Sequence, residues 1–189
     1  MKKTLIILAL LATAVGQTQA ATYTVDPDHT HVTFEIPHFG TSTNRGRFVE
    51  KDGVVEFDKA AKTGKVSINF PIADLSTGAL RFDKHLQSAD FFDVEKFPIA
   101  SFTGDKFTFN GDKVSEVSGV LTLKGQAHPI TLKATNFNCY QNPNFKAEVC
   151  GGDFETVIDR TQWGIDFGLA YGFSKNVKLV IQVEAVKQP

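Results

Sequence analysis

The feature that most constrains this chain is a strict alternation of apolar and polar residues from position 29 to 38, HTHVTFEIPH. One side of this segment carries Val32, Phe34, Ile36 and His38. The opposite side carries His29, His31, Thr33 and Glu35. A period of two residues is typical of a β-strand with one buried and one solvated face. The pattern therefore predicts a strand that covers an apolar interior.

The same alternation recurs along the chain. Residues 65–72 place Val66, Ile68, Phe70 and Ile72 on one side, and residues 177–186 place Val177, Leu179, Ile181, Val183 and Ala185 on one side. Shorter segments of this kind, including 145–149 and 154–159, are separated by turn signals such as Asp52-Gly53. Short strands with turn signals every 8 to 12 residues or so indicate an antiparallel sandwich or barrel.

One helical pattern interrupts the strands. Apolar residues recur at intervals of three and four, at Leu75, Ala79, Phe82 and Leu86. A second short segment is expected from Ser88, a suitable N-cap, to Phe97. A single helical insertion among so many strands suits a barrel with a lid.

The first 20 residues read as a targeting segment rather than as part of the fold. Lys2 and Lys3 precede an apolar run from Thr4 to Val15, which is shorter than the roughly 20 residues of a membrane-spanning helix. Small residues at Thr18 and Ala20 then offer a cleavage site. We expect residues 1–20 to be a cleaved signal peptide, residues 21–189 to form one domain, and the protein to be periplasmic.

The two cysteines, Cys139 and Cys150, are an even pair in a chain that is expected to be exported. Such a pair predicts a disulfide, because exported proteins meet an oxidising compartment. A redox pair is less well supported, since the CxxC spacing is missing. Asn142-Pro143 and Gly151-Gly152 are expected to form turns near the two cysteines.

Composition leaves the content of the interior open. The chain has 17 Phe and one Met, and rigid aromatic walls can either pack a core or line a standing cavity. Composition alone favours the packed core, because most buried aromatic residues belong to cores. The formal net charge of −1 argues against nucleic acids and anionic membrane surfaces as main partners.

Little in the sequence indicates catalysis. Nucleophile elbows, HExxH motifs, phosphate loops and dinucleotide fingerprints are all missing from the sequence. His29 and His31, two apart on the expected strand, would point the same way and could take part in a zinc site with a third ligand. A metal-dependent hydrolase is therefore the alternative function, although a solvated strand face explains the two histidines more simply. We expect no catalytic residue, no metal ligand and no cofactor.

Several motifs together resemble those of the YceI-like family of periplasmic, lipocalin-like polyisoprenoid-binding proteins. They begin with His29 and the run Val32-x-Phe34-x-Ile36-x-His38-Phe39-Gly40. The most specific one is Asp83-Lys84-His85-Leu86-x-Ser88-Ala89-Asp90-Phe91-Phe92-Asp93 with Phe97-Pro98. Others are Gly119-x-Leu121-Thr122-Leu123-x-Gly125, His128-Pro129-Ile130-Thr131-Leu132, and the segment from Val177 to Val186. The motifs cover nearly all of residues 21–189 in the order of the family.

The resemblance implies an all-β fold, an eight-stranded antiparallel lipocalin-like β-barrel with a short helical insertion. It also implies an apolar tunnel that holds a long-chain isoprenoid or another apolar lipid, for binding, transport or sequestration, in a monomer or homodimer. On that basis the residues expected to line the tunnel or its lid are Val32, Phe34, Ile36, His38, Phe48, Ile68, Phe70, Phe82, Leu86, Phe91 and Phe92.

Two positions depart from the family pattern. The family often has Arg immediately before the residue equivalent to Asp83, where this chain has Phe82, with Arg81 one residue earlier. His31 stands where an apolar or variable residue is usual, which weakens a metal role for it. The shifted arginine favours an uncharged quinone or another apolar ligand over a pyrophosphate.

Overall fold

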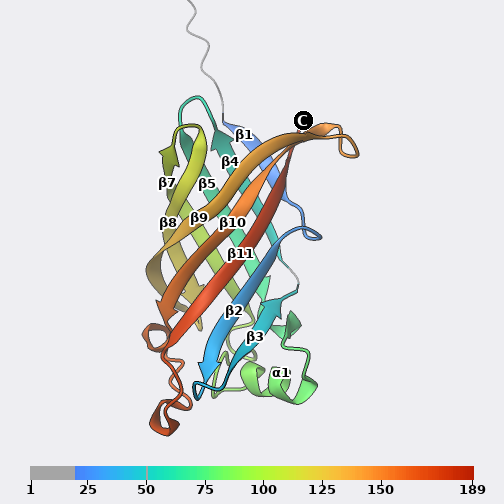
Figure 1. The fold of residues 1–189 in the computed structure, drawn as a ribbon. Helices are drawn as coiled ribbons and strands as arrows, with labels where there is room; N and C mark the ends of the chain where they lie inside the picture. The colour runs from blue at the N-terminus through green and yellow to red at the C-terminus, as the bar shows by residue number, and fades with distance from the viewer. Residues whose placement is uncertain (1–19, 50) are drawn as a thin grey trace, which may run out of the picture.

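The computed structural model describes residues 20–49 and 51–189, so the expected signal peptide, apart from Ala20, lies outside the described residues. Eight antiparallel strands form a closed barrel (Figure 1), which confirms the expected architecture. In sheet order these are β1 (Ala21–Val25), β4 (Asp52–Asp58), β5 (Thr63–Pro71), β7 (Ile99–Asn110), β8 (Lys113–Leu123), β9 (Gln126–Asn142), β10 (Ala147–Asp159) and β11 (Asn176–Lys187). The ring closes because β1 pairs with both β4 and β11.

Strand β11 is long enough to pair with two different strands along one edge. Its residues 185–187 pair with β1, and its residues 178–182 pair with β2 (His31–His38). From β2 the sheet continues through β3 (Ser42–Phe48) to the short β6 (Leu75–Ser76). One end of the barrel is thus closed by β1, and the other is bordered by a three-stranded extension.

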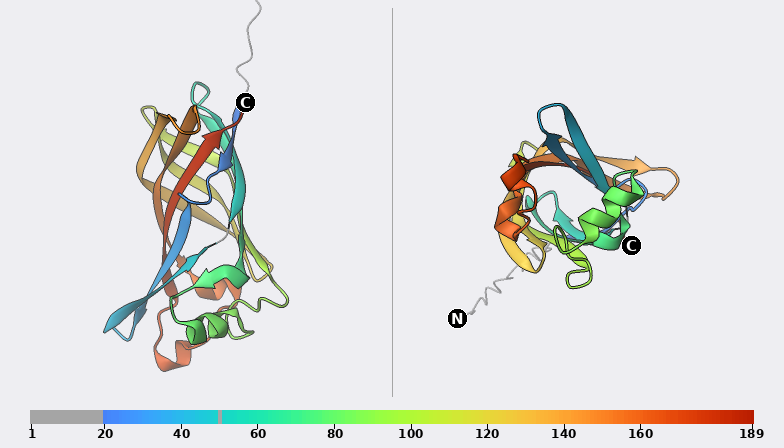
Figure 2. Two further views of the ribbon diagram at one scale, coloured as in Figure 1. Left: turned by 90° about the vertical axis from the view of Figure 1, so that its right-hand side faces the viewer. Right: turned by 90° about the horizontal axis from the view of Figure 1, so that it is seen from below.

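The single α-helix described, α1 (Leu80–Gln87), lies at the end of the barrel bordered by this extension (Figures 1 and 2). Three 3₁₀ turns complete the structure: η1 (Ile72–Asp74), η2 (Arg160–Trp163) and η3 (Leu169–Tyr171). We call the end bordered by α1, the β2–β3 turn and residues 160–175 the mouth. Seen from below, α1 and residues 160–175 lie on opposite sides of it (Figure 2, right).

The inward faces follow the predicted alternation. Val32 and Phe34 of β2 are buried, as are Ile68 and Phe70 of β5 and Val177, Ile181 and Ala185 of β11. The segments 145–149 and 154–159, expected to be two strands, largely belong to the one strand β10. A register shift between Asp153 and Phe154 interrupts the alternation without ending the strand, as β-bulges do.

The predicted helical segment is shorter than expected. Leu75 lies in β6 and pairs with Phe48 of β3, so its apolar side chain is buried by the sheet rather than by the helix. Ser88 is the C-cap of α1, not the N-cap of a second helix, and its hydroxyl donates to the carbonyl oxygen of His85. Residues 88–97 form turns.

Cys139 and Cys150 form a disulfide that joins directly opposed positions of β9 and β10. The hairpin between these strands turns near Pro143, as expected, but Gly151 and Gly152 lie within β10 rather than in a turn. A Cβ atom at Gly151 would overlap with the carbonyl oxygen of Val183. Glycine is needed here for the close approach of β11, not for a change of direction.

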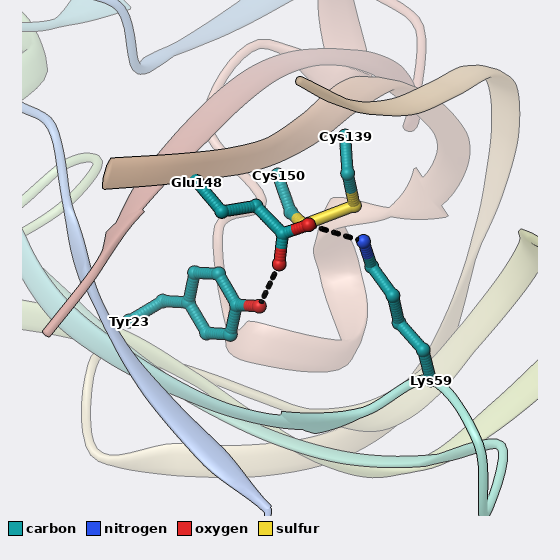
Figure 3. Close-up of a disulfide and its surroundings, with 5 residues drawn as sticks. All are labelled: Tyr23, Lys59, Cys139, Glu148 and Cys150. Carbon is teal, nitrogen blue, oxygen red and sulfur yellow. Dashed lines mark hydrogen bonds and ion pairs between the residues drawn. A yellow bond between two sulfur atoms is a disulfide. The ribbon is translucent and has the colours of Figure 1, made fainter. Parts of the chain in front are cut away.

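Beside the disulfide, a polar group lies at the end of the barrel opposite the mouth (Figure 3). The Tyr23 hydroxyl donates to Glu148 Oε1 over 2.7 Å, and Lys59 Nζ donates to Glu148 Oε2. Burial raises the pKa of the Tyr23 hydroxyl, and the carboxylate beside it raises this pKa further. Burial alone would raise the pKa of Glu148, but the bonds from Lys59 and Tyr23 outweigh it and lower that pKa. At pH 7 the Tyr23 hydroxyl therefore stays protonated, and Glu148 stays ionised beside Lys59.

We predict that replacing both cysteines, in Cys139→Ser/Cys150→Ser, lowers the free energy of unfolding by roughly 3 kcal/mol, because the open hairpin gains freedom when unfolded. Denaturant unfolding of the variant and the parent protein measures this difference. Thiol mapping of protein purified without reductant should find no free thiol. Two free thiols, or equal stability of variant and parent, would contradict the prediction.

Candidate functional site

A cavity of about 400 Å³ occupies the barrel interior on the mouth side. Its walls come from β2, β3, β5, β7, β8, β10 and β11, while α1, residues 91–92 and residues 160–173 border it from the mouth. A volume of this size is in the range of small-molecule binding sites. The interior is therefore not filled by side chains alone, although composition favoured a packed core.

Ten of the eleven residues predicted to line the tunnel line this cavity. They are Val32, Phe34, Ile36, His38, Phe48, Phe70, Phe82, Leu86, Phe91 and Phe92. Ile68 instead lines a second, smaller cavity of about 90 Å³. That these residues contact a ligand stays a prediction, since the structure holds none.

The second cavity lies beyond the first along the barrel axis. Successive inward residues of one strand pass from one cavity to the other: Ala100 of β7 lines the first and Phe102 lines the second. The same order holds for Leu179 and Ile181 of β11. The apolar interior therefore contains two chambers that follow one another along the barrel.

The four polar residues of the first cavity come from elements at the mouth. They are His38 and Asn44 near the β2–β3 turn, His85 of α1, and Arg160 of η2. The second cavity is lined by apolar side chains, with Tyr23 and Gly151 at the far end. The interior therefore has one end with hydrogen-bonding groups and a long apolar remainder.

Arg160 is the residue that reasoning from sequence missed. Its side chain is only 4% exposed and lines the cavity. Nε donates to the carbonyl oxygen of Ser174 (2.9 Å), Nη1 to that of Ile165 (2.7 Å) and Nη2 to that of Phe167 (2.9 Å). Burial lowers the pKa of this guanidinium, but an arginine stays charged at neutral pH. The geometry makes Arg160 the centre around which residues 160–175 are folded.

Trp163 anchors the same segment to the barrel wall. It is almost completely buried, and its Nε1 donates to the carbonyl oxygen of Leu121 over 3.1 Å. Gly164, at φ 63°, follows it in the left-handed conformation that glycine adopts readily. A single Trp next to several glycines was the sequence signal for an ordered segment here rather than a plain loop.

Asp83 and His85 of α1 bind different partners, as their spacing of two residues suggested. Asp83 Oδ1 accepts from the backbone N–H and the hydroxyl of Thr77, both over 2.6 Å. His85 Nε2 lies 3.2 Å from Asp90 Oδ2, and its ring lies edge-on to Phe91 and Phe167. These contacts fix α1 at the mouth, and Asp83 and His85 do not pair with each other.

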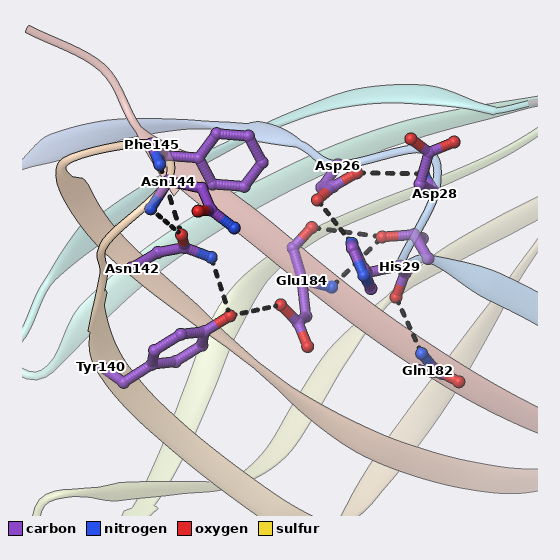
Figure 4. Close-up of polar contacts among 10 residues, drawn as sticks. Asp26, Asp28, His29, Tyr140, Asn142, Asn144, Phe145, Gln182 and Glu184 are labelled. Atoms are coloured by element: carbon purple, nitrogen blue, oxygen red, sulfur yellow. Dashed lines mark hydrogen bonds and ion pairs between the residues drawn. The ribbon is translucent and has the colours of Figure 1, made fainter.

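His29 and His31 do not share a strand face, and this expectation was wrong. His29 precedes β2 in a bend, where its Nδ1 lies 2.8 Å from Asp26 Oδ2 (Figure 4). His31 is partly buried, which together with the positive charges of Arg47 and Lys51 lowers its pKa. Among residues 20–49 and 51–189 no three His, Cys, Asp or Glu side chains are grouped to hold a metal ion. The alternative function, a metal-dependent hydrolase, assumed that His29 and His31 lie on one strand face, and the structure does not show that arrangement.

In the part of the chain that the structure describes, no helix is long and apolar enough to cross a membrane.

We predict that Arg160→Ala lowers the free energy of unfolding by roughly 3 kcal/mol or more, because three main-chain carbonyls lose a charged donor. Denaturant unfolding measures the change. Arg45→Ala is the matched control: Arg45 is exposed and pairs with Glu35, so its loss should change stability by less than about 1 kcal/mol. Equal effects of the two variants would contradict the central role of Arg160.

Comparison with known proteins gives this geometry a context. The YceI-like domain matches residues 23–185. A UPF0312 protein of Pseudomonas putida is 36% identical over 193 residues, which cover 100% of this chain and 99% of that protein. A crystal structure of the Campylobacter jejuni YCEI protein has a TM-score of 0.70 and 25% identity, with all of both chains covered. A polyisoprenoid binding domain from Saccharophagus degradans has a TM-score of 0.64 and 11% identity, with 90% of this chain and 100% of that one covered. The chain belongs to the YceI-like family.

Proposed function

We propose that this protein binds a long-chain isoprenoid lipid inside the barrel and carries or sequesters it in the periplasm. The observation that carries the proposal is the apolar cavity inside the barrel, with its polar lining residues at the mouth and a second apolar chamber behind it. A molecule with a small polar head and a long hydrocarbon tail matches this distribution. The name of the Saccharophagus degradans domain, a polyisoprenoid binding domain of the same fold, supports this ligand class.

The orientation of the ligand follows from the polar residues. The head group would lie near His38, His85 and Arg160 at the mouth, and the tail would extend past Ala100 toward the second chamber. Arg160 uses three of its five N–H groups on main-chain carbonyls, and forms no salt bridge within the described residues. An oxygen atom of a quinone or alcohol head can accept from such a donor. Arg81, by contrast, is exposed on α1 and does not line the cavity.

The tail supplies more than enough favourable free energy for tight binding. Fully burying a tail of about thirty carbons at ~0.8 kcal/mol each would give roughly 24 kcal/mol before any cost, an upper bound because the cavities of about 400 and 90 Å³ hold only part of such a tail. This exceeds the practical limit of about 18 to 21 kcal/mol for non-covalent affinity, so ordering the flexible tail must offset part of it. Binding therefore needs no specific polar contact, and several long apolar molecules can serve as ligands. Native mass spectrometry of the purified protein identifies a copurified lipid directly.

We predict that Ala100→Phe weakens binding of a fluorescent long-chain isoprenoid roughly a hundredfold. The new ring fills space for about four methylene groups, which corresponds to about 3 kcal/mol. Ala100 is a buried residue in the cavity wall, while Thr103 of the same strand is exposed on the outer face. Thr103→Phe is therefore the control and should bind like the parent protein.

Binding titrations and thermal unfolding of both variants give the result. If Ala100→Phe stays folded and binds the probe with parental affinity, the cavity is not the binding site.

We also predict that Phe91→Ala/Phe92→Ala speeds ligand release roughly tenfold or more while changing association less, because changes within one interface mostly alter dissociation. Phe91 contacts the rings of His85 and Phe167, and Phe92 contacts Phe48. Stopped-flow displacement of the bound probe measures the rate. Val120→Ala, on the exposed face of β8, is the control. An unchanged release rate in the double variant would refute a lid role.

A further inference from the structure

Three apolar side chains are strongly exposed at the mouth. Phe39, in the β2–β3 turn, is 57% exposed, Leu80, at the start of α1, is 72% exposed, and Tyr171, in η3, is 73% exposed. The three segments that carry them project from the same end of the barrel (Figures 1 and 2). Exposed apolar groups gathered at one end, around the opening of a cavity, indicate an interaction surface.

This exposed surface is continuous with the cavity wall. The ring of Phe39 lies 4.9 Å from that of His38 and 4.6 Å from that of Phe173. Both of these neighbours line the cavity. Phe167, in the same segment as Phe173, also lines the cavity and is itself partly exposed. A series of ring contacts therefore leads from the cavity wall to the exposed side chain of Phe39.

Phe39 is placed where the backbone disfavours it. Phe39 and Gly40 are the central residues of the β2–β3 turn, with φ values of 51° and 70°, and Thr41 N–H donates to the carbonyl oxygen of His38. Hairpin turns with two positive φ values favour Asn followed by Gly, and a bulky residue in this region is strained. The chain thus accepts both backbone strain and an exposed ring at this tip. Backbone strain and exposure of an aromatic ring both lower the stability of the folded protein. A residue that has both is expected to serve a function other than stability.

We propose that the mouth docks on the surface of a lipid bilayer, with Phe39, Leu80 and Tyr171 inserted, so that the cavity opens directly onto the hydrocarbon. The inference rests on the proposed function, because a membrane-derived isoprenoid would otherwise have to cross water to reach the barrel. Three side chains on separate projecting turns suit a fluid phase, into which each can insert independently. A protein partner would need a matching pocket for each.

The charges around the mouth agree with a bilayer surface. Two acids near this end carry their counter-charges with them, since Lys175 pairs with Asp159 and Lys96 pairs with Asp93. Arg81 and Lys84 are exposed on α1, and long basic side chains can keep their charge at the level of the head groups. With acids and bases mixed at this end, attachment should depend on apolar insertion and not on anionic lipid.

The test is flotation with vesicles of pure phosphatidylcholine that contain no isoprenoid. We expect the parent protein to float with the vesicles at both low and high salt. Phe39→Asn and Tyr171→Ser should each lower the membrane partition coefficient about tenfold, since each removes one inserted ring. Because Asn suits the turn better, Phe39→Asn should unfold at the parental temperature or above, which separates docking from folding.

Phe145→Ser is the matched control. Phe145 is 48% exposed in the hairpin turn between β9 and β10, at the opposite end of the barrel (Figure 4). Its backbone N–H donates to the Asn142 side chain, a bond that the substitution keeps. Flotation of Phe145→Ser should equal that of the parent protein. An equal loss in this control, no flotation of the parent, or its release by salt would overturn the proposal.

Two further measurements separate docking from its alternatives. Titration of each variant with a soluble fluorescent isoprenoid should give parental affinity, because Phe39 and Tyr171 lie outside the cavity wall. If the parent binds no isoprenoid but floats through Phe39, docking stands and the proposed function fails. If sedimentation shows that Phe39→Asn turns a dimer into a monomer while flotation is unchanged, the surface belongs to a second copy and docking is overturned.

Discussion

The structure depends on how the edge of β11 is shared. Residues 185–187 of this strand pair with β1 and close the ring, while residues 178–182 pair with β2. Beyond β2 the sheet ends in β3 and the two-residue β6. The barrel is consequently a complete ring at the end with the disulfide. At the other end, β2, β3 and β6 extend the sheet beyond the ring of eight strands. The wall at this end is completed by α1 and residues 160–175. The cavity opens toward this composite end because only there are the walls built from separate segments.

A buried cation sets the form of the mouth. A guanidinium in an apolar wall is unfavourable unless its donors are satisfied. The carbonyls of Ile165, Phe167 and Ser174 satisfy Arg160 only when residues 160–175 wrap around it. That arrangement positions Phe167 and Phe173 in the cavity wall. The polar centre and the apolar opening are therefore two parts of one local structure, and the same segment carries the exposed Tyr171 on its outer side.

Much of the barrel wall was predictable from local pattern. The alternation in β2, β5 and β11 predicted which side chains face inward, because the pleat of a strand ties side-chain direction to position. Five of the ten predicted residues that line the first cavity do so for that reason: Val32, Phe34, Ile36, His38 and Phe70. The disulfide was predictable from the even cysteine count in a chain expected to be exported. The predictions were wrong where one local pattern is compatible with two structures. Gly151 was predicted to lie in a turn but lies within β10. Leu75 was predicted to be helical but lies in β6 and pairs with β3.

The amino-acid sequence by itself determined the strands, their inward faces and the family to which the chain belongs, because these follow from residue spacing and motif order. Only the tertiary structure decided what the inward faces enclose. Whether a barrel is full or hollow depends on the fit of side chains from strands far apart in sequence, such as Phe34 and Leu121. The division into two chambers, the burial of Arg160 and the separate surroundings of His29 and His31 have the same origin. Each depends on partners that the fold brings from distant segments, and no local spacing encodes them.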